Sequence, residues 1–330
     1  MNSSAVPLNQ ANHRKLRRSL LDWYGQKRRD LPWRRDADPY RIWVSEIMLQ
    51  QTCVAAVLDH YARFFERFPT VQNLAAAREP TVLAAWSGLG YYHRARRMHQ
   101  AAKMIVRERK GNFPRTAEEL QELPGIGRYT AAAIASIAFG EAVAAVDGNV
   151  DRVLGRMFGG DEGTESTWQR ADALLDRNRP GDFNQAMMEL GATICTPRAP
   201  QCMLCPLNPW CQSRGAEAAR PQAARKRKNL CYALVRENRA VFLVQRPAEA
   251  SLMAGMWELP TVPESQRNGH NPVARLRHSI TDTDYEVSII RLLPEVLETD
   301  GRWFSRKQWE RLPLTGLTRK VLRRLVSESQ

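Results

Sequence analysis

Four cysteines near residue 200 constrain the fold of this chain more than any other feature. Cys195, Cys202, Cys205 and Cys211 follow the spacing Cys-x6-Cys-x2-Cys-x5-Cys, and four prolines interrupt the same 17 residues. Because proline lacks the amide hydrogen that a helix needs, this segment is expected to be a loop that can wrap its thiolates around one centre. Four thiolates suit an iron–sulfur cluster or a tetrahedral zinc ion. Zinc sites usually use paired Cys-x2-Cys units, and only one such pair is present, so the spacing favours the cluster.

The remaining composition points to a reduced, basic protein. The net charge of +14 favours a polyanionic partner, nucleic acid before membrane, although a merely soluble basic protein would show the same surplus. Residues 1–18 lack the apolar core of a secretory signal, and no apolar run is long enough to span a bilayer, so we expect a cytoplasmic protein without a membrane partner. Cys53 falls within a helical pattern and is expected to be an ordinary buried residue.

The spacing of apolar residues divides the chain into two regions. Residues 1–212 follow a helical period that breaks at glycine and proline, residues 213–229 form a basic linker with little to bury, and residues 230–330 change to a mixture of strands and helix. We expect helices at 14–29, 40–68, 79–87, 92–109, 117–123, 128–139, 149–158, 166–178 and 182–194. After the linker we expect strands at 230–235, 240–245, 256–261 and 285–292, and a helix at 305–325.

Two of the expected helices are joined by Pro124-Gly125-Ile126-Gly127. Glycine at both turn positions lets another molecule approach the backbone closely. The amides of Gly125, Gly127 and the first turn of the following helix would face an anion such as a DNA phosphate. A plain turn between helices is the alternative, but the basic composition and the cysteine loop favour DNA binding.

These segments together resemble the helix-hairpin-helix DNA glycosylases related to endonuclease III, and within them the adenine DNA glycosylases. The resemblance implies a helical catalytic region with a helix-hairpin-helix at about 117–139, a [4Fe-4S] cluster in the loop 195–211, and a C-terminal α/β domain of the Nudix-like type. The matching stretches are Leu31–Arg34, Trp43–Thr52, Gly88–Tyr92, Leu123–Ala131, Val146–Val150 and the cysteine loop.

The residue after Arg128 separates two branches of this superfamily. Endonuclease III-type enzymes carry a lysine there, whose amine forms a Schiff base with the sugar and cuts the strand, whereas this chain has Tyr129. The resemblance therefore implies a glycosylase without that lyase step, acting on adenine opposite 8-oxoguanine or guanine in double-stranded DNA, as a monomer. The alternatives are an endonuclease III-like glycosylase and lyase for oxidised pyrimidines, and a non-catalytic iron–sulfur protein that binds DNA.

Two carboxylates are candidates for the chemistry of base removal. Glu46 lies in an apolar helical stretch, and burial should raise its pKa and keep it protonated as an acid. Asp147 precedes a helix, where the simplest role for aspartate is to cap the helix. The resemblance implies that Glu46 protonates N7 of adenine, that Asp147 faces the cationic sugar, that Asn149 supports Asp147, and that Tyr129 positions the reacting groups.

Adenine must leave the base stack before the bond to its sugar can break. By resemblance, Gln51 and Tyr91 fill the opened duplex, and Trp33, Arg34 and Gln185 lie near the adenine pocket. The family reads the opposite base with a Phe-Ser-His loop in its second domain. Here that loop corresponds to Ile280, Thr281 and Asp282, so the lesion is read differently or by His278 and Ser279 in a shifted register. The pyrophosphatase motif of active Nudix enzymes is missing, so this domain should bind rather than hydrolyse.

Overall fold

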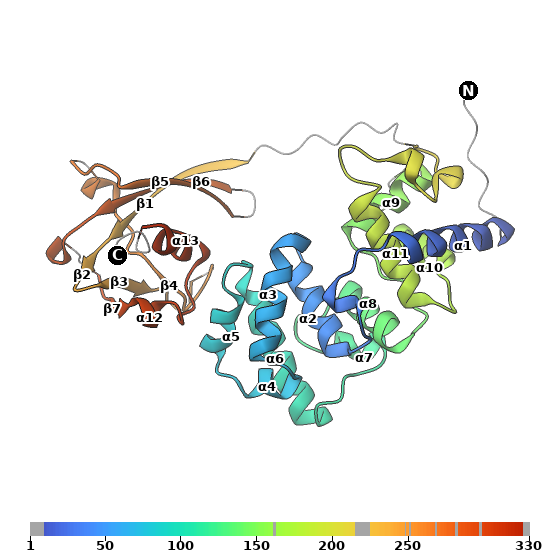
Figure 1. The fold of residues 1–330 in the computed structure, drawn as a ribbon, viewed down its shortest axis with the longest axis horizontal. Helices are drawn as coiled ribbons and strands as arrows, with labels where there is room; N and C mark the ends of the chain where they lie inside the picture. Colours follow the sequence, from blue (N-terminus) through green and yellow to red (C-terminus); the bar gives the residue numbers. More distant parts are fainter. Residues whose placement is uncertain are drawn as a thin grey trace. The chain divides into compact units, whose positions relative to one another are not determined.

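The computed structural model describes residues 10–160, 163–214, 225–247, 249–250, 252–267, 269–280, 283–296 and 299–325. Helices dominate the part before residue 214, and strands with two helices make up the part after residue 225 (Figure 1). None of the helices in these ranges is both long and apolar enough to cross a membrane.

The described residues group into two compact units. The first contains the chain up to Tyr61, the short segment Thr70–Gln72, and the chain from Gln100 through the cysteine loop. The second contains Ala62–Pro69, Asn73–His99 and the residues after the linker. The second unit therefore includes helices that the sequence assigned to the N-terminal region.

Eleven α-helices lie within the described part of the chain before residue 214. They are α1 (Gln10–Lys27), α2 (Pro39–Leu49), α3 (Val54–Arg67), α4 (Val71–Ala76), α5 (Glu79–Trp86), α6 (Tyr92–Arg109), α7 (Ala117–Gln121), α8 (Arg128–Phe139), α9 (Gly148–Phe158), α10 (Thr164–Leu174) and α11 (Pro180–Thr193). Three 3-10 turns accompany them: η1 (Pro32–Arg34), η2 (Cys202–Leu204) and η3 (Asn208–Trp210). The predicted bounds of α6 and α8 are confirmed, whereas α4 was not predicted.

The core of the first unit forms around α11, which contacts α1, α8 and α9. Leu16 and Leu20 of α1 and Leu190 of α11 are completely buried, and each such side chain contributes about 1.5–3 kcal/mol to folding. Leu207 and Trp210 of the cysteine loop join the same cluster. The loop is thereby packed onto α1, α9, α10 and α11.

The expected single helix over residues 40–68 is wrong, because the chain turns between α2 and α3. Gln51 adopts φ 55°, a left-handed conformation that a helix interior does not allow. The expectation that Cys53 is buried is also wrong: it is exposed in this turn. Both segments are apolar on one face, so their periodicity gave no sign of the interruption.

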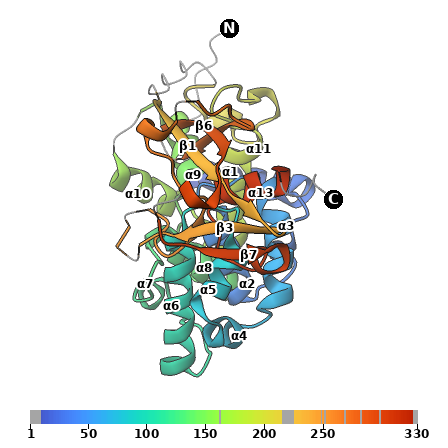
Figure 2. The same cartoon turned by 90° about the vertical axis from the view of Figure 1, so that its left-hand side faces the viewer.

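The second unit contains two small sheets. The strands are β1 (Lys226–Leu234), β2 (Arg236–Glu237), β3 (Ala240–Gln245), β4 (Trp257–Glu258), β5 (Ala274–Ile280), β6 (Thr283–Arg291) and β7 (Arg302–Ser305). One sheet has the order β1-β6-β5, with β1 parallel and β5 antiparallel to β6. In the other, β3 pairs with β2, β4 and β7. Strands β1 and β6 lie side by side in both views (Figures 1 and 2).

Helix α13 (Gly316–Leu325) supplies much of the core beneath these sheets. Its buried residues Val321 and Leu322 join Leu243 of β3 and Ile289 of β6 in one apolar cluster. The predicted α/β character of this region is confirmed, but strands β2, β5 and β7 were not predicted. The expected helix over 305–325 is interrupted: α12 (Arg306–Trp309) and α13 are separate. Residues 226–229, assigned to the linker, form the first part of β1.

Within the second unit, the end of α5 is tied to the chain before α13. Ser87 Oγ donates a hydrogen bond of 2.9 Å to the carbonyl of Leu314, and the hydroxyl of Tyr92 donates to the same carbonyl at 3.2 Å. Arg319 Nε donates to Ser87 Oγ at 2.8 Å. The loop between α5 and α6, which carries Tyr91, is therefore anchored to the C-terminal region of the chain.

Candidate active site

Glu46 and Tyr129 meet between helices α2 and α8. Glu46 is only 7% exposed, and the hydroxyl of Tyr129 donates a hydrogen bond of 2.6 Å to its Oε2. Burial raises the pKa of Glu46 to about 7, opposed by the Tyr129 hydrogen bond and assisted by the negative charge of Asp147. A carboxyl with this pKa keeps its proton in about half of the molecules at pH 7 and can act as an acid. Burial also raises the pKa of Tyr129 well above its usual value, so the phenol remains a donor.

Asp147 caps helix α9. Its Oδ1 accepts hydrogen bonds from the amides of Asn149 and Val150 at 2.9 and 2.8 Å, and its Oδ2 accepts from Asn149 Nδ2 at 2.8 Å. Asp147 therefore caps the helix, and the same contacts suit a catalytic carboxylate. Three donors fix the orientation of the carboxylate at the positive end of the helix dipole.

A chain of hydrogen bonds connects this carboxylate with the cysteine loop. Arg152 donates to Asn149 Oδ1 at 2.9 Å and to the carbonyl of Cys195 at 2.9 Å. Its guanidinium also donates to the carbonyl of Gly191 at 2.7 Å, where α11 passes close to Asn149. Asn149 is thus held from both sides, by Asp147 and by Arg152.

Arg34 and Trp33, expected near the adenine pocket, occupy the turn η1 and are largely buried. Trp33 packs edge-on against Tyr61, with ring centroids 5.2 Å apart. Arg34 forms an ion pair of 2.8 Å with Glu189 of α11. Gln185, also on α11, is half-buried.

Gln51 and Tyr91, the residues expected to enter the duplex, share an unusual backbone. Both have positive φ, 55° at Gln51 and 46° at Tyr91, which costs free energy in residues with a side chain. Trp86 and Arg94 donate hydrogen bonds to backbone carbonyls of the loop that carries Tyr91. Trp86 Nε1 donates to the carbonyl of Gly90 at 3.0 Å, and Arg94 donates to the carbonyl of Leu89 at 3.1 Å.

The residues matched to the lesion-reading loop begin at the end of β5 and precede β6 in the sequence. Thr281 and Asp282 lie outside the described residues, and Ile280 ends β5. Of the shifted-register candidates, Ser279 donates a hydrogen bond of 2.6 Å to Asp284. His278 is half-buried, and burial together with Lys320 lowers its pKa.

The Pro-Gly-x-Gly turn joins α7 to α8 as predicted. Gly125 has φ 81°, a conformation that only glycine adopts without strain. Gly127 is different: its φ is −91°, and a Cβ added there would meet no atom of the protein within 4 Å. Nothing inside the described structure requires glycine at 127.

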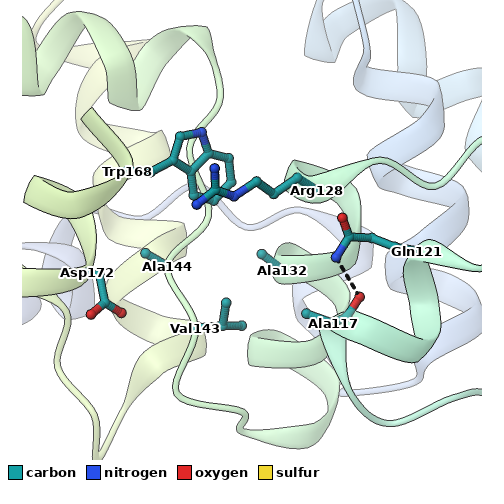
Figure 3. A pocket seen from close by; sticks show the side chains of 8 residues that line it. All are labelled: Ala117, Gln121, Arg128, Ala132, Val143, Ala144, Trp168 and Asp172. Atoms are coloured by element: carbon teal, nitrogen blue, oxygen red, sulfur yellow. Dashed lines mark hydrogen bonds between the residues drawn. The ribbon is translucent and has the colours of Figure 1, made fainter. Parts of the chain in front are cut away.

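Beside this hairpin, Arg128 lines a cavity of about 200 Å³ (Figure 3). Its guanidinium lies over the ring of Trp168, 4.0 Å from the centroid, and pairs with Glu165 at 2.8 Å. Gln121 and Asp172 line the same cavity, together with alanine and valine side chains. These contacts tie the start of α8 to α10 and hold the hairpin in place.

The four cysteines lie in one loop that is clamped to α9. The buried Arg156 donates to Cys195 Sγ at 3.3 Å and to the carbonyl of Thr196 at 2.8 Å, and the amide of Arg214 donates to Cys211 Sγ at 3.4 Å. Burial, assisted by the other three cysteines, raises the pKa of the Cys205 thiol to about 12. Among the described side chains, no group of three or more His, Cys, Asp or Glu is arranged to hold a metal ion.

Sequence reasoning missed Glu189 and Arg152. Glu189 lies in an apolar run of α11 and is 1% exposed, so the signal that singled out Glu46, a glutamate among apolar residues, was also present there. Arg152 follows the matched stretch Val146–Val150 by two residues, on the exposed side of the helical pattern, and carried no comparable signal.

A helical hairpin, a buried acid and a capped carboxylate are the features of a helix-hairpin-helix protein of base excision repair. Residues 44–175 match the HhH-GPD superfamily of base excision DNA repair proteins. A thermostable thymine-DNA glycosylase superposes on 63% of this chain and all of its own, with a TM-score of 0.58 and 30% identity. Endonuclease III in a non-covalent complex with DNA superposes on 64% of this chain and 98% of its own, with a TM-score of 0.56; at 24% identity it supports the fold alone.

The particular family follows from a curated relative. The adenine DNA glycosylase of Homo sapiens is 37% identical over 93% of this chain and 73% of its own length. The chain belongs to the adenine DNA glycosylase family. It is a DNA-binding hydrolase of N-glycosyl bonds, and the endonuclease III-like lyase and the non-catalytic alternative are set aside.

Proposed function

We propose that this glycosylase, acting as a monomer, releases adenine from mispairs with 8-oxoguanine or guanine and leaves an abasic site. The observation that carries the proposal is the pairing of a buried acid, Glu46, with a fixed carboxylate, Asp147. Splitting a bond between a base and its sugar needs a proton for the leaving base and a negative charge for the sugar that remains. This site supports both roles with two carboxyl groups in different environments.

Glu46 serves as the acid. Tyr129 donates to Oε2, which leaves Oε1 to carry the transferable proton. That proton passes to N7 of adenine, and the electron pair of the C1′–N9 bond leaves with the protonated base. The sugar becomes an oxocarbenium-like cation. A general acid of this kind contributes about 100- to 10,000-fold to the rate.

Asp147 stabilises the sugar cation by its negative charge. Asn149 and the first amides of α9 hold the carboxylate in one orientation, so little reorganisation is needed when the cation forms. Water then adds to C1′ and gives its proton to the Glu46 carboxylate, which restores the acid. The products are free adenine and an abasic sugar in an uncut strand.

Access to adenine depends on the residues that open the duplex. Gln51 and Tyr91 present side chains from strained turns, and this supports their entry into the space that the flipped base leaves. The hairpin at Gly125–Gly127 offers backbone amides to a phosphate and holds the DNA next to them. Thr281 and Asp282 would read the opposite base, as the sequence match implies.

Cys195, Cys202, Cys205 and Cys211 would hold a [4Fe-4S] cluster. Their fit rests on the donor set, four thiols in one loop, and on N–H groups of Arg156 and Arg214 directed at two of the sulfurs, an arrangement that suits cluster ligands. When bound, the cluster supplies a rigid core for the loop and a centre for one-electron transfer.

A duplex assay tests the reaction. We expect single-turnover release of adenine from A:8-oxoguanine and A:G duplexes, with strand breaks only after alkali treatment. A duplex with thymine glycol opposite adenine serves as the control and should remain intact. Release of thymine glycol, or a borohydride-trapped complex with the wild-type protein, would contradict the proposal.

Metal analysis tests the cluster. Protein purified without oxygen should contain roughly four irons per chain and show a broad absorption band at about 400 nm. The Cys202→Ser variant should lose most of both signals. Stoichiometric zinc without iron would show that the four cysteines bind zinc and not the cluster.

A further inference from the structure

The loop that carries Tyr91 has an unusual backbone. Between the end of α5 and the start of α6, Gly88, Gly90 and Tyr91 all have positive φ, at 111°, 69° and 46°. Glycine adopts such angles without strain, whereas a tyrosine does so at a cost of about 1–2 kcal/mol. A residue stays in a strained conformation only where the surrounding structure holds it there. The contacts of this loop therefore decide the position of Tyr91.

Both ends of the loop bind one acceptor, the carbonyl oxygen of Leu314. Ser87 Oγ donates to it at 2.9 Å, and the hydroxyl of Tyr92 donates to it at 3.2 Å. Ser87 Oγ also accepts a hydrogen bond of 2.8 Å from Arg319 Nε of α13. Ser87 and Tyr92 are both buried, so water does not readily replace these contacts. The residue before the loop and the residue after Tyr91 are thereby fixed at one point.

Strand β4 sets the direction of the Leu314 carbonyl. Leu314 is completely buried and forms an isolated parallel bridge with Trp257. The amide of Trp257 donates to the carbonyl of Pro313 at 2.9 Å, and the amide of Thr315 donates to the carbonyl of Trp257 at 3.0 Å. The acceptor that the loop binds is therefore part of the C-terminal sheet region, which lies in the same compact unit as α5 and the start of α6.

The flanking helices hold the middle of the loop. Trp86 Nε1 donates to the carbonyl of Gly90 at 3.0 Å, and Arg94 donates to the carbonyl of Leu89 at 3.1 Å. The guanidinium of Arg94 also lies over the ring of Tyr91, 5.4 Å from its centroid. These contacts fix the shape of the loop, whereas the two hydrogen bonds to the carbonyl at 314 fix its ends against β4 and α13.

We propose that Ser87 and Tyr92 are positioning residues for base flipping, which bind the Leu314 carbonyl and thereby hold Tyr91 in the conformation that enters the duplex. The inference rests on the proposed role of Tyr91 in filling the space that adenine leaves. It gives the C-terminal region a task in opening the duplex, besides reading the opposite base. Without the anchor the loop relaxes to less strained angles, and DNA binding must then supply the free energy that orders it.

Hydrogen exchange in the free protein tests the anchor without any substrate. Exchange of the amides in residues 87–91 should be about tenfold faster in Ser87→Ala and in Tyr92→Phe, because each variant loses a hydrogen bond that restricts opening of the loop. Ser305→Ala is the matched control, since it removes the capping hydroxyl of α12 in the same unit. It should leave the loop unchanged. Equal exchange in the wild type and both loop variants would overturn the proposal.

Adenine release connects the anchor with Tyr91. Single-turnover release should fall about fivefold to tenfold in Ser87→Ala and Tyr92→Phe, by the same factor for A:8-oxoguanine and A:G, because opening is affected and not the reading of the opposite base. In a Tyr91→Ala background the same two substitutions should have no further effect, since residues that act through one side chain are not additive. Additive losses in that background would show a structural role and overturn the proposal.

The two measurements separate this proposal from the proposed function. A wild type that releases adenine from neither duplex would refute the function itself. An active wild type with unchanged loop exchange, or with additive losses, would refute only the role of Ser87 and Tyr92. If Ser87→Ala does not fold, because Arg319 loses its acceptor, Tyr92→Phe decides, since it removes a single hydroxyl from the same carbonyl.

Discussion

The phenol of Tyr129 donates a hydrogen bond of 2.6 Å to Oε2 of Glu46, across 83 positions of sequence. The sequence resemblance implies a lysine at this position in endonuclease III-type enzymes. Here the side chain contacts the candidate acid, and its hydrogen bond lowers the pKa of Glu46.

The Tyr129→Phe variant should change the pH profile in a defined direction. The hydrogen bond lowers the pKa of Glu46, so its loss should raise that pKa and move the basic limb of adenine release upward by about one pH unit. The maximal rate should fall, because the acid loses its fixed orientation. A limb that moves downward in single-turnover measurements would show that Tyr129 does not donate to Glu46 in the complex with DNA.

The Glu46→Gln variant should be inactive and, above neutral pH, more stable than the wild type. Burial raises the pKa of Glu46 from 4.5 to about 7, so the folded state binds the additional proton between these values and loses stability as pH rises through them. Glutamine has no charge to bury. We expect the free energy of unfolding at pH 8 to rise by up to about 3 kcal/mol, and little difference at pH 4. Urea titrations at both pH values measure this; equal stabilities at pH 8 would contradict the raised pKa.

The Gly191→Ala variant should impair catalysis through Asn149. A Cβ at residue 191 would lie 2.6 Å from Asn149 Cβ and 2.9 Å from its carbonyl oxygen, closer than atoms tolerate. Relief of this clash moves Asn149 away from Asp147, at a cost of about 1–3 kcal/mol. We expect single-turnover release to fall at least about tenfold, the effect of losing about 1.4 kcal/mol of transition-state stabilisation.

Gly155→Ala on α9 is the matched control for that variant. Its Cβ would meet its nearest neighbour, the carbonyl of Gly160, at 4.0 Å, an ordinary contact. Its activity should be unchanged and its stability equal or slightly higher, since alanine favours a helix. Equal effects of the two substitutions would show that Asn149 is not the residue affected.

The Gly127→Ala variant should weaken DNA binding without destabilising the protein. The added methyl group meets no atom of this chain but would stand where a phosphate approaches the first turn of α8. We expect affinity for an undamaged duplex to fall about tenfold, the loss of roughly one good hydrogen bond. Gly125→Ala should behave differently, because a positive φ of 81° costs alanine about 1–2 kcal/mol of stability. Comparison of binding isotherms with thermal unfolding separates the two effects.

Local patterns predicted much of the helical unit because the relevant information is local. The bounds of α6 and α8 follow from apolar spacing and from flanking glycines, which act over a few residues. The break at Gln51 was missed, since α2 and α3 are both apolar on one face and the turn between them contains neither glycine nor proline. Strand β5 was missed because Arg275 and Arg277 interrupt its apolar residues, a pattern that fits a strand with one exposed face equally well as a loop.

By itself the sequence determined the cysteine loop, the hairpin, the positive charge and the burial of Glu46, all properties of neighbouring residues. Only the tertiary structure decided which groups the buried carboxyl groups contact. Tyr129 meets Glu46, and Glu189 meets Arg29 and Arg34, only because α8 and α11 pack against the elements that carry those groups. A buried charge requires some partner, but which one it finds depends on the crossing of distant helices. The amino-acid pattern indicates that a buried carboxyl group needs a polar partner, and only the packed fold sets the distance between the two groups.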